Sequence, residues 1–168
     1  MAAPCYITWS GITPTVSLAQ SAVVSNNSIT TPRTILQLAT GKKIRVVEWG
    51  YLLSQAPTAP FQAELIDTGT GTGATITQGS VLNYNDTGAS TSSALVASVT
   101  QTGYNASGEG TVGTVRLLAQ TFDLSTYFKQ QFPLGREPEV AASCFLRIRV
   151  TPTTTNAVNI IAYCIWEE

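Results

Sequence analysis

The sequence contains no histidine among its 168 residues. Histidine is the most common general base in enzymes and the most common metal ligand, so its absence excludes the usual form of both kinds of site. Serine and threonine nucleophiles need an activating base, and no G-x-S-x-G elbow occurs. A zinc or calcium site would have to be built from the dispersed carboxylates and thiols. We therefore expect a protein that is not an enzyme and holds neither a metal ion nor a cofactor.

Charged residues are also scarce, at 11% of the chain with a formal net charge of -1, against about 25% in an ordinary globular protein. A nucleic-acid-binding protein needs a basic surface to neutralise phosphates, and the only basic cluster is Lys42, Lys43 and Arg45. The high apolar content, 43%, is the opposite of a disordered composition. The chain should fold and should not bind nucleic acid.

Long apolar runs and a cysteine framework are missing as well. No stretch approaches the ~18 apolar residues of a transmembrane helix, so we expect no membrane association. Residues 1–9 lack the basic and apolar regions of a signal peptide, which predicts synthesis in the cytoplasm. The three cysteines include Cys144 and Cys164, which lie in apolar runs and are predicted to be buried free thiols.

The sequence is rich in threonine and serine, which together occupy 39 positions. Threonine is β-branched and favours strands. Strand-like segments recur with turn signals between them at residues 5–9, 34–38, 44–53, 61–66, 114–120, 145–151 and 156–166. No convincing amphipathic helix occurs. The pattern predicts an all-β protein, an antiparallel β-sandwich or a jelly-roll-like barrel.

Alternating residues predict which faces of two strands are buried. Phe61, Ala63 and Leu65 should share one face. Residues 146, 148 and 150 (Leu, Ile and Val) should form another buried face, with Arg147 and Arg149 opposite. Residues 152–155 would connect the last two strands as a hairpin.

Composition divides the chain into an N-terminal segment, residues 1–33, and a single β domain, residues 34–168. Proline interrupts the first segment, which predicts edge strands or an extended arm that reaches a neighbouring subunit. Residues 68–113 form a glycine-rich insertion, with nine of the thirteen glycines. We expect it to be exposed, with short strands around 81–82 and 94–99 and mobile tips at 68–73 and 103–110; the alternative is that it is poorly ordered. Residues 124–130 are predicted to form one helical turn capped by Ser125.

Two patterns suggest chemistry, and both have simpler explanations. Residues 108–113 match G-x-G-x-x-G, but no strand-to-helix turn is predicted there, so the segment is interpreted as a flexible turn. Glu64, Asp67 and Asp86 are the nearest candidates for a paired acid/base site. We favour cross-strand ion pairs instead, in which Glu64 and Glu48 face Arg45, Arg147 or Arg149.

Tyrosine and tryptophan are the residue types enriched at protein interfaces. The alternative is that most of the aromatic residues line the core of the domain and its rim. The residues predicted to form an interface are Tyr6, Trp9, Arg33, Phe132 and Arg136.

Several segments resemble a family of small virion proteins of tailed bacteriophages. The similarity lies in residues 131–140 (QFPLGREPEV), 145–151 (FLRIRVT) and 165–168 (IWEE), with 34–38 and 46–50 resembling the family's first strands. The resemblance implies a capsid decoration (cement) or minor capsid protein on the capsid surface of the virion. Its partners would be the major capsid protein and further copies of itself, with a homotrimer favoured. It implies no catalytic residue.

Other functions fit the same composition. A tail or baseplate component with a receptor- or carbohydrate-binding β domain would use the same kind of chain, and its location on the particle would distinguish it. A hydrolase is a third possibility, and it would require a cleft with two carboxylates close together.

Overall fold

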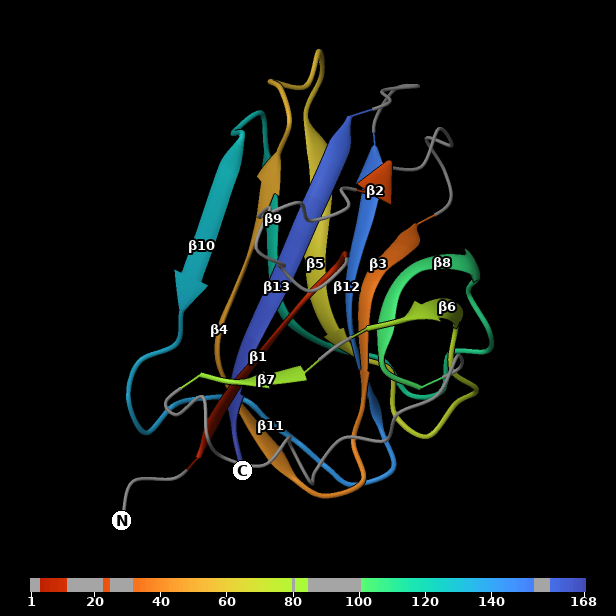
Figure 1. Cartoon of the computed structure of the whole chain (residues 1–168), viewed down its shortest axis with the longest axis vertical. Coiled ribbons are helices and arrows are strands. Elements are labelled where there is room, and N and C mark those ends of the chain that lie inside the picture. The colour runs from red at the N-terminus through yellow and green to blue at the C-terminus, as the bar shows by residue number, and fades with distance from the viewer. Residues whose placement is uncertain (1–3, 12–22, 25–31, 80, 85–100, 153–157) are drawn as a thin grey trace.

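The structure is a computed structural model, and it describes residues 4–11, 23–24, 32–79, 81–84, 101–152 and 158–168. Within them it contains strands and no helix, in two antiparallel sheets that face each other (Figure 1). Each sheet is open among the described residues, because the strand at either end of its order pairs on one side only. The predicted all-β fold is therefore confirmed as a sandwich, and the closed-barrel alternative does not apply.

The first sheet, sheet A, has seven strands. Its order is β10 (Tyr127–Gln131), β4 (Ile44–Leu53), β13 (Asn159–Glu167), β1 (Cys5–Trp9) and β7 (Val81–Asn83); β11 (Glu139–Val140) also pairs with β4, and β2 (Val23–Val24) pairs with β13.

The second sheet, sheet B, has six strands. Its order is β6 (Thr75–Gln78), β8 (Gly103–Gly108), β3 (Arg33–Ala39), β12 (Phe145–Pro152), β5 (Phe61–Asp67) and β9 (Arg116–Asp123). In Figure 1, β6 and β8 curl away from the other strands at one end of this sheet.

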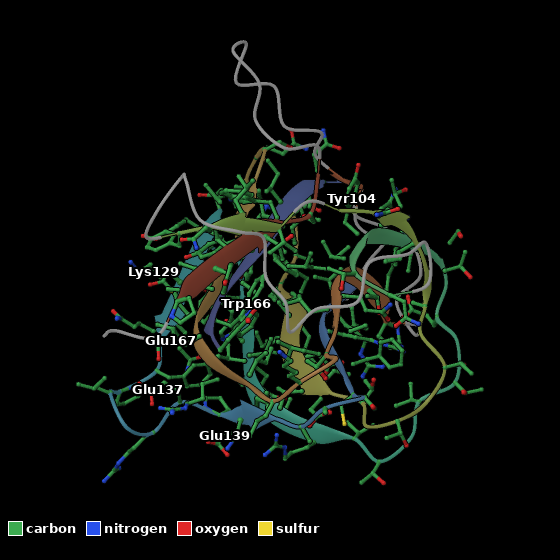
Figure 2. All side chains as sticks on the ribbon, turned by 60° about the horizontal axis from the view of Figure 1, so that its bottom comes forward. Tyr104, Lys129, Glu137, Glu139, Trp166 and Glu167 are labelled. Atoms are coloured by element: carbon green, nitrogen blue, oxygen red, sulfur yellow. The ribbon has the colours of Figure 1, made fainter. Side chains whose placement is uncertain are left out.

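The apolar core lies between the two sheets and is dominated by aromatic rings. Trp49 and Trp166 are fully buried, and Figure 2 shows Trp166 inside the sandwich. Tyr6 stacks on Trp166 with 6.0 Å between ring centroids. Trp49 lies 5.1 Å from Phe128. Offset and tilted ring pairs at these distances add to the stabilisation from burial alone.

The predicted faces of β5 and β12 are confirmed. Phe61, Ala63 and Leu65 are all buried on the core side of β5, as are residues 146, 148 and 150 on β12. Period-2 alternation identified these faces because each strand has one face in the core. Cys144 and Cys164 are buried and free, as expected, and so is Cys5.

The last two strands do not form the predicted hairpin. β12 pairs with β3 and β5 in sheet B, whereas β13 pairs with β4 and β1 in sheet A. Both strands present an apolar face to the same core, β12 from sheet B and β13 from sheet A. The alternation of apolar residues would be the same if the two strands paired within one sheet, so it could not identify the correct arrangement. Residues 153–157, in the connection itself, lie outside the described residues.

The helical turn predicted at residues 124–130 is wrong. Residues 127–131 form β10, which pairs with β4 over Tyr127↔Leu52 through Gln131↔Glu48. Phe128 of this strand packs in the core beside Trp49 and Tyr51. Ser125 caps no helix; its hydroxyl hydrogen-bonds the Asp123 carboxylate. Tertiary packing of one aromatic side chain therefore outweighs a weak local preference.

The first described strand is an interior strand and not the predicted edge strand. β1 pairs with β13 on one side and with β7 on the other. The prolines that suggested an edge do not interrupt it, since Pro4 precedes the strand. The remaining residues of the proposed arm, 12–22 and 25–31, lie outside the described residues.

The glycine-rich region packs against sheet B at some described residues and is exposed at others, among them 107, 108 and 110–113, as expected; the mobility of its tips stays a prediction. Residues 103–108 are the strand β8, and Thr68 and Ala74 are fully buried. Gly110 has φ +66°, and a Cβ there would lie 2.6 Å from the Thr72 carbonyl oxygen. Glycine therefore permits close contact between two backbone segments here. The expected strand at 94–99 lies outside the described residues.

Two buried polar side chains hold this region against the outer face of sheet B. The Arg147 guanidinium is fully buried and donates to the carbonyl oxygens of Glu109 and Thr72, at 2.8 and 2.9 Å. Gln37, opposite Arg147 in the ladder, donates to the Gln101 carbonyl oxygen at 2.9 Å and accepts from the Ala74 amide at 2.9 Å. Residues 68–79 and 101–115 thus form a cover, and burial under it lowers the pKa of Arg147.

Replacing Arg147 should loosen the cover. Arg147→Met removes the donors that satisfy two carbonyl oxygens at the cover, and we expect a loss of about 2–3 kcal/mol in the free energy of unfolding. Amide hydrogen exchange in β6 and β8 should accelerate more than in β4. Arg45→Met, at a half-exposed side chain, should cost less than about 0.5 kcal/mol. Equal losses in the two variants would contradict this assignment.

Stability should fall in strong alkali because of the buried tyrosines. Burial, with a contribution from Asp123, raises the pKa of Tyr51 to about 12. An unfolded tyrosine titrates near 10, so from pH 10 to 12 the unfolded chain loses a proton that the native state retains, and the free energy of unfolding decreases. In Tyr51→Phe this decrease should be shallower by up to about 1.4 kcal/mol per pH unit. Denaturant unfolding at several pH values measures the slope, and an unchanged slope would refute the prediction.

Candidate interaction surface

The structure places the predicted interface residues Tyr6 and Trp9 on opposite faces of β1. Tyr6 is 5% exposed and stacks on Trp166 in the core of its own chain. Trp9 is half-buried and packs with a small apolar cluster on the outer face of sheet A, which includes Ile7, Tyr163 and Ile165. The alternative, that most aromatic residues serve the domain's own packing, describes Tyr6 well.

The other three predicted residues lie apart from these. Arg33 is half-buried, and its guanidinium hydrogen-bonds the Ala106 carbonyl oxygen at 3.2 Å and the Asn105 side chain, so it anchors β8. Phe132 is half-buried against the core. Arg136 is exposed in the loop between β10 and β11. The structure does not bring the five residues together, and their contact with a partner stays a prediction.

The candidate carboxylates are engaged in ion pairs. Glu64 lies opposite Arg149 in the β5–β12 ladder and pairs with it at 2.5 Å, which confirms the cross-strand interpretation for Glu64. The partners predicted for Glu48 are wrong, because Glu48 pairs with Lys129 at 3.2 Å. Asp67 pairs with Arg116 at 3.1 Å and accepts from the Gly69 amide. Asp86 lies outside the described residues.

The described part of the chain offers little else that could carry chemistry. It contains no group of three or more carboxylate or thiol side chains able to hold a metal ion. Within the described ranges, no helix has the length and apolar character that crossing a membrane requires. The G-x-G-x-x-G segment leads into the strand β9, and its Glu109 accepts hydrogen bonds from the Thr34 amide and hydroxyl at 2.6 and 2.5 Å. That segment is therefore an anchored turn of the cover and lacks the helix that a phosphate site requires.

Exposed apolar side chains are frequent along one edge of the sandwich, on the edge strands β9 of sheet B and β10 of sheet A and on the residues that flank them. We call this the β9–β10 side. Ten large apolar side chains are exposed among the described residues, and seven lie here: Leu52, Val115, Leu117, Phe122, Leu124, Tyr127 and Leu134. Leu134 is 95% exposed, and Tyr127 lies directly opposite Leu52. Apolar clustering of this kind marks interaction surfaces.

Sequence reasoning missed most of this surface. Tyr127 belonged to the aromatic set that suggested an interface, but Leu117, Phe122 and Leu134 were not singled out. One signal was present: the predicted strand 114–120 has apolar residues at 115, 117 and 118. Residues 115 and 117 alternate, but the adjacent residue 118 does not, so the three apolar residues do not fit a single buried face.

A polar cluster borders the β9–β10 side on the outer face of sheet A. Glu48 accepts a hydrogen bond from the Tyr163 hydroxyl at 2.7 Å and pairs with Lys129 at 3.2 Å. Figure 2 shows Lys129 at the periphery of the molecule. Burial and the adjacent Glu48 raise the pKa of Tyr163, and the hydrogen bond to Glu48 raises that of Lys129.

Gly50 provides the space for this cluster. It is the ladder partner of both Tyr163 and Lys129. A Cβ at residue 50 would lie 2.8 Å from the Tyr163 ring and would also collide with the Phe128 carbonyl oxygen. The tyrosine ring thus crosses the strand where β4 has no side chain.

No family model, curated protein or solved structure matches the chain. The described surface combines an apolar side with paired charges, an arrangement suited to binding another macromolecule.

Substituting Gly50 should be costly. Gly50→Ala forces the Tyr163 ring or β10 to move, and we expect a loss of about 1–3 kcal/mol in the free energy of unfolding. Gly108→Ala is the matched control, because its Cβ would meet nothing closer than the Thr75 hydroxyl at 4.0 Å. That control should change stability by less than about 1 kcal/mol. Urea midpoints measure both, and similar midpoints would show that Gly50 has no spatial role.

Proposed function

We propose that this protein is a structural component of a bacteriophage virion, a capsid decoration or minor capsid protein that binds the assembled shell. The observation that supports it most directly is the concentration of exposed apolar side chains on the β9–β10 side. A monomeric protein without a partner seldom exposes so many large apolar side chains along one edge, because such exposure favours association. The β9–β10 side is part of a sandwich whose two sheets enclose one core rich in aromatic residues.

The resemblance of residues 131–140, 145–151 and 165–168 to small virion proteins supports the same proposal. Residues 132–138 follow β10 directly and include Leu134 and Arg136, both exposed. A segment similar to virion proteins therefore contributes to the β9–β10 side. Low charge also suits a protein that acts by close contact with neighbouring coat proteins.

Such a protein would stabilise the shell by mass action. It binds the assembled shell better than the unassembled subunits, so occupancy favours the shell by RT ln(1 + [L]/Kd), about 2.7 kcal/mol per site at a hundredfold excess over Kd. Its partners in this proposal are the major capsid protein and further copies of itself, on the capsid surface. A trimer at a threefold position of the shell would gain avidity; that stoichiometry stays a prediction.

Location on the particle tests the proposal. An antibody against the purified protein should label the heads of particles of the phage that encodes it, seen by negative-stain electron microscopy. Stripping the protein should lower the temperature at which the heads release DNA, and adding it back should restore that temperature. Label on the tail or baseplate would instead support a receptor- or carbohydrate-binding component. Particles without label would refute a virion function.

A further inference from the structure

The open edge of β9 is the longest unpaired strand edge among the described residues. β9 has eight residues and pairs only with β5, whereas the other strands at the ends of the two sheets, β6, β7 and β10, have four, three and five. Natural edge strands are protected from pairing by shortness, lysine or proline. β10 carries Lys129, but β9 contains neither lysine nor proline.

A β-bulge in β9 places two large apolar side chains on one face. The ladder with β5 shifts register so that Leu65 is opposite Ala119 and Ile66 is opposite Leu117, which leaves Leu118 as the extra residue. Leu117 and Phe122 are therefore both on the outer face of sheet B, although they are an odd number of positions, five, apart in the sequence. They are 50% and 61% exposed.

With Leu118 set aside, β9 occupies seven consecutive ladder positions. In order they are Arg116, Leu117, Ala119, Gln120, Thr121, Phe122 and Asp123. Gln120 is the central position and is exposed. The sequence is complementary about this centre: a cation is at one end and an anion at the other, and a large apolar side chain stands next to each.

We propose that β9 pairs antiparallel with β9 of a second copy of this chain, about a two-fold axis at Gln120. Arg116 of one copy then lies opposite Asp123 of the other, and Leu117 lies opposite Phe122, each pair occurring twice. A two-fold axis perpendicular to the sheet keeps the outer face of both copies on the same side, so the apolar pairs meet. The two six-stranded sheets join into one continuous sheet.

The charges and the backbone both favour this register. The Arg116 side chain is 52% exposed while its Nη2 pairs with Asp67 and donates to the Glu139 carbonyl oxygen. A guanidinium has five N–H donors, so others can reach a partner carboxylate. Asp123 is exposed at the other end. Pairing also satisfies the backbone groups along the open edge of β9, and cross-strand opposite charges and apolar pairs stabilise a sheet. An isologous contact of this kind closes on itself as a dimer, so this proposal stands as an alternative to the homotrimer that the resemblance implies.

Gln120 provides the test, because it would face its own copy across the axis. The wild-type protein should sediment at twice its 17.8 kDa mass. Gln120→Glu places two like charges opposite each other and should weaken the dimer at least tenfold, as should Gln120→Lys. An equimolar mixture of the two variants should restore dimers, since the charges are then complementary. A wild-type monomer at 100 µM, a trimer, or a dimer that Gln120→Glu leaves intact would overturn the proposal.

Cross-linking tests the register directly. Gln120→Cys should form an intermolecular disulfide under mild oxidation, because the three native thiols are buried and the introduced one faces its own copy. Gln78→Cys is the matched control, an exposed glutamine on β6 at the opposite end of the same sheet. Cross-linking at 120 and not at 78 supports the proposal. Equal cross-linking at the two positions, or none at 120, contradicts it. Circular dichroism of each variant establishes that it is folded.

Discussion

The burial of one charge, on Arg147, determines much of the arrangement outside the core. A guanidinium removed from water needs acceptors, and the two that it uses are carbonyl oxygens from residues 72 and 109, far apart in the sequence. Both cover segments must therefore lie over sheet B at the same place. The backbones can approach this closely because glycine stands at position 110. The glycine-rich composition thus permits close packing around a buried cation, and the mobility that it also suggested stays a prediction.

Sequence patterns identified the sandwich because most of its strands have one apolar and one polar face. Alternation located the buried faces of β5 and β12, and it paired Glu64 with Arg149 correctly. It failed for Arg147, since a charged residue on an outward face ordinarily meets water, and only the tertiary fold places a cover above it. It also failed for residues 127–131, whose five residues are too few to distinguish a turn of helix from an edge strand.

The surface was harder to predict than the core. The predicted interface residues were chosen by residue type, and type does not separate a tyrosine that stacks in the core, such as Tyr6, from one that is exposed, such as Tyr127. Position in the sheet makes that separation. β9 and β10 end their respective sheets on the same side of the sandwich, so apolar side chains that neighbouring strands would otherwise cover remain accessible. Sheet order is a property of the whole chain and is not visible in any one segment.

The pairing of β1 with β13 has a consequence for how the protein is made. Cys5 is the ladder partner of Glu167, which lies more than 150 positions later in the sequence. β1 can therefore pair with its main neighbour only after those residues have been synthesised. Contacts of such long sequence separation form slowly because the intervening chain must be ordered first. On the ribosome, sheet A therefore cannot be completed until β13 has left the exit tunnel, and nascent β1 lacks this neighbour while all the intervening strands are synthesised.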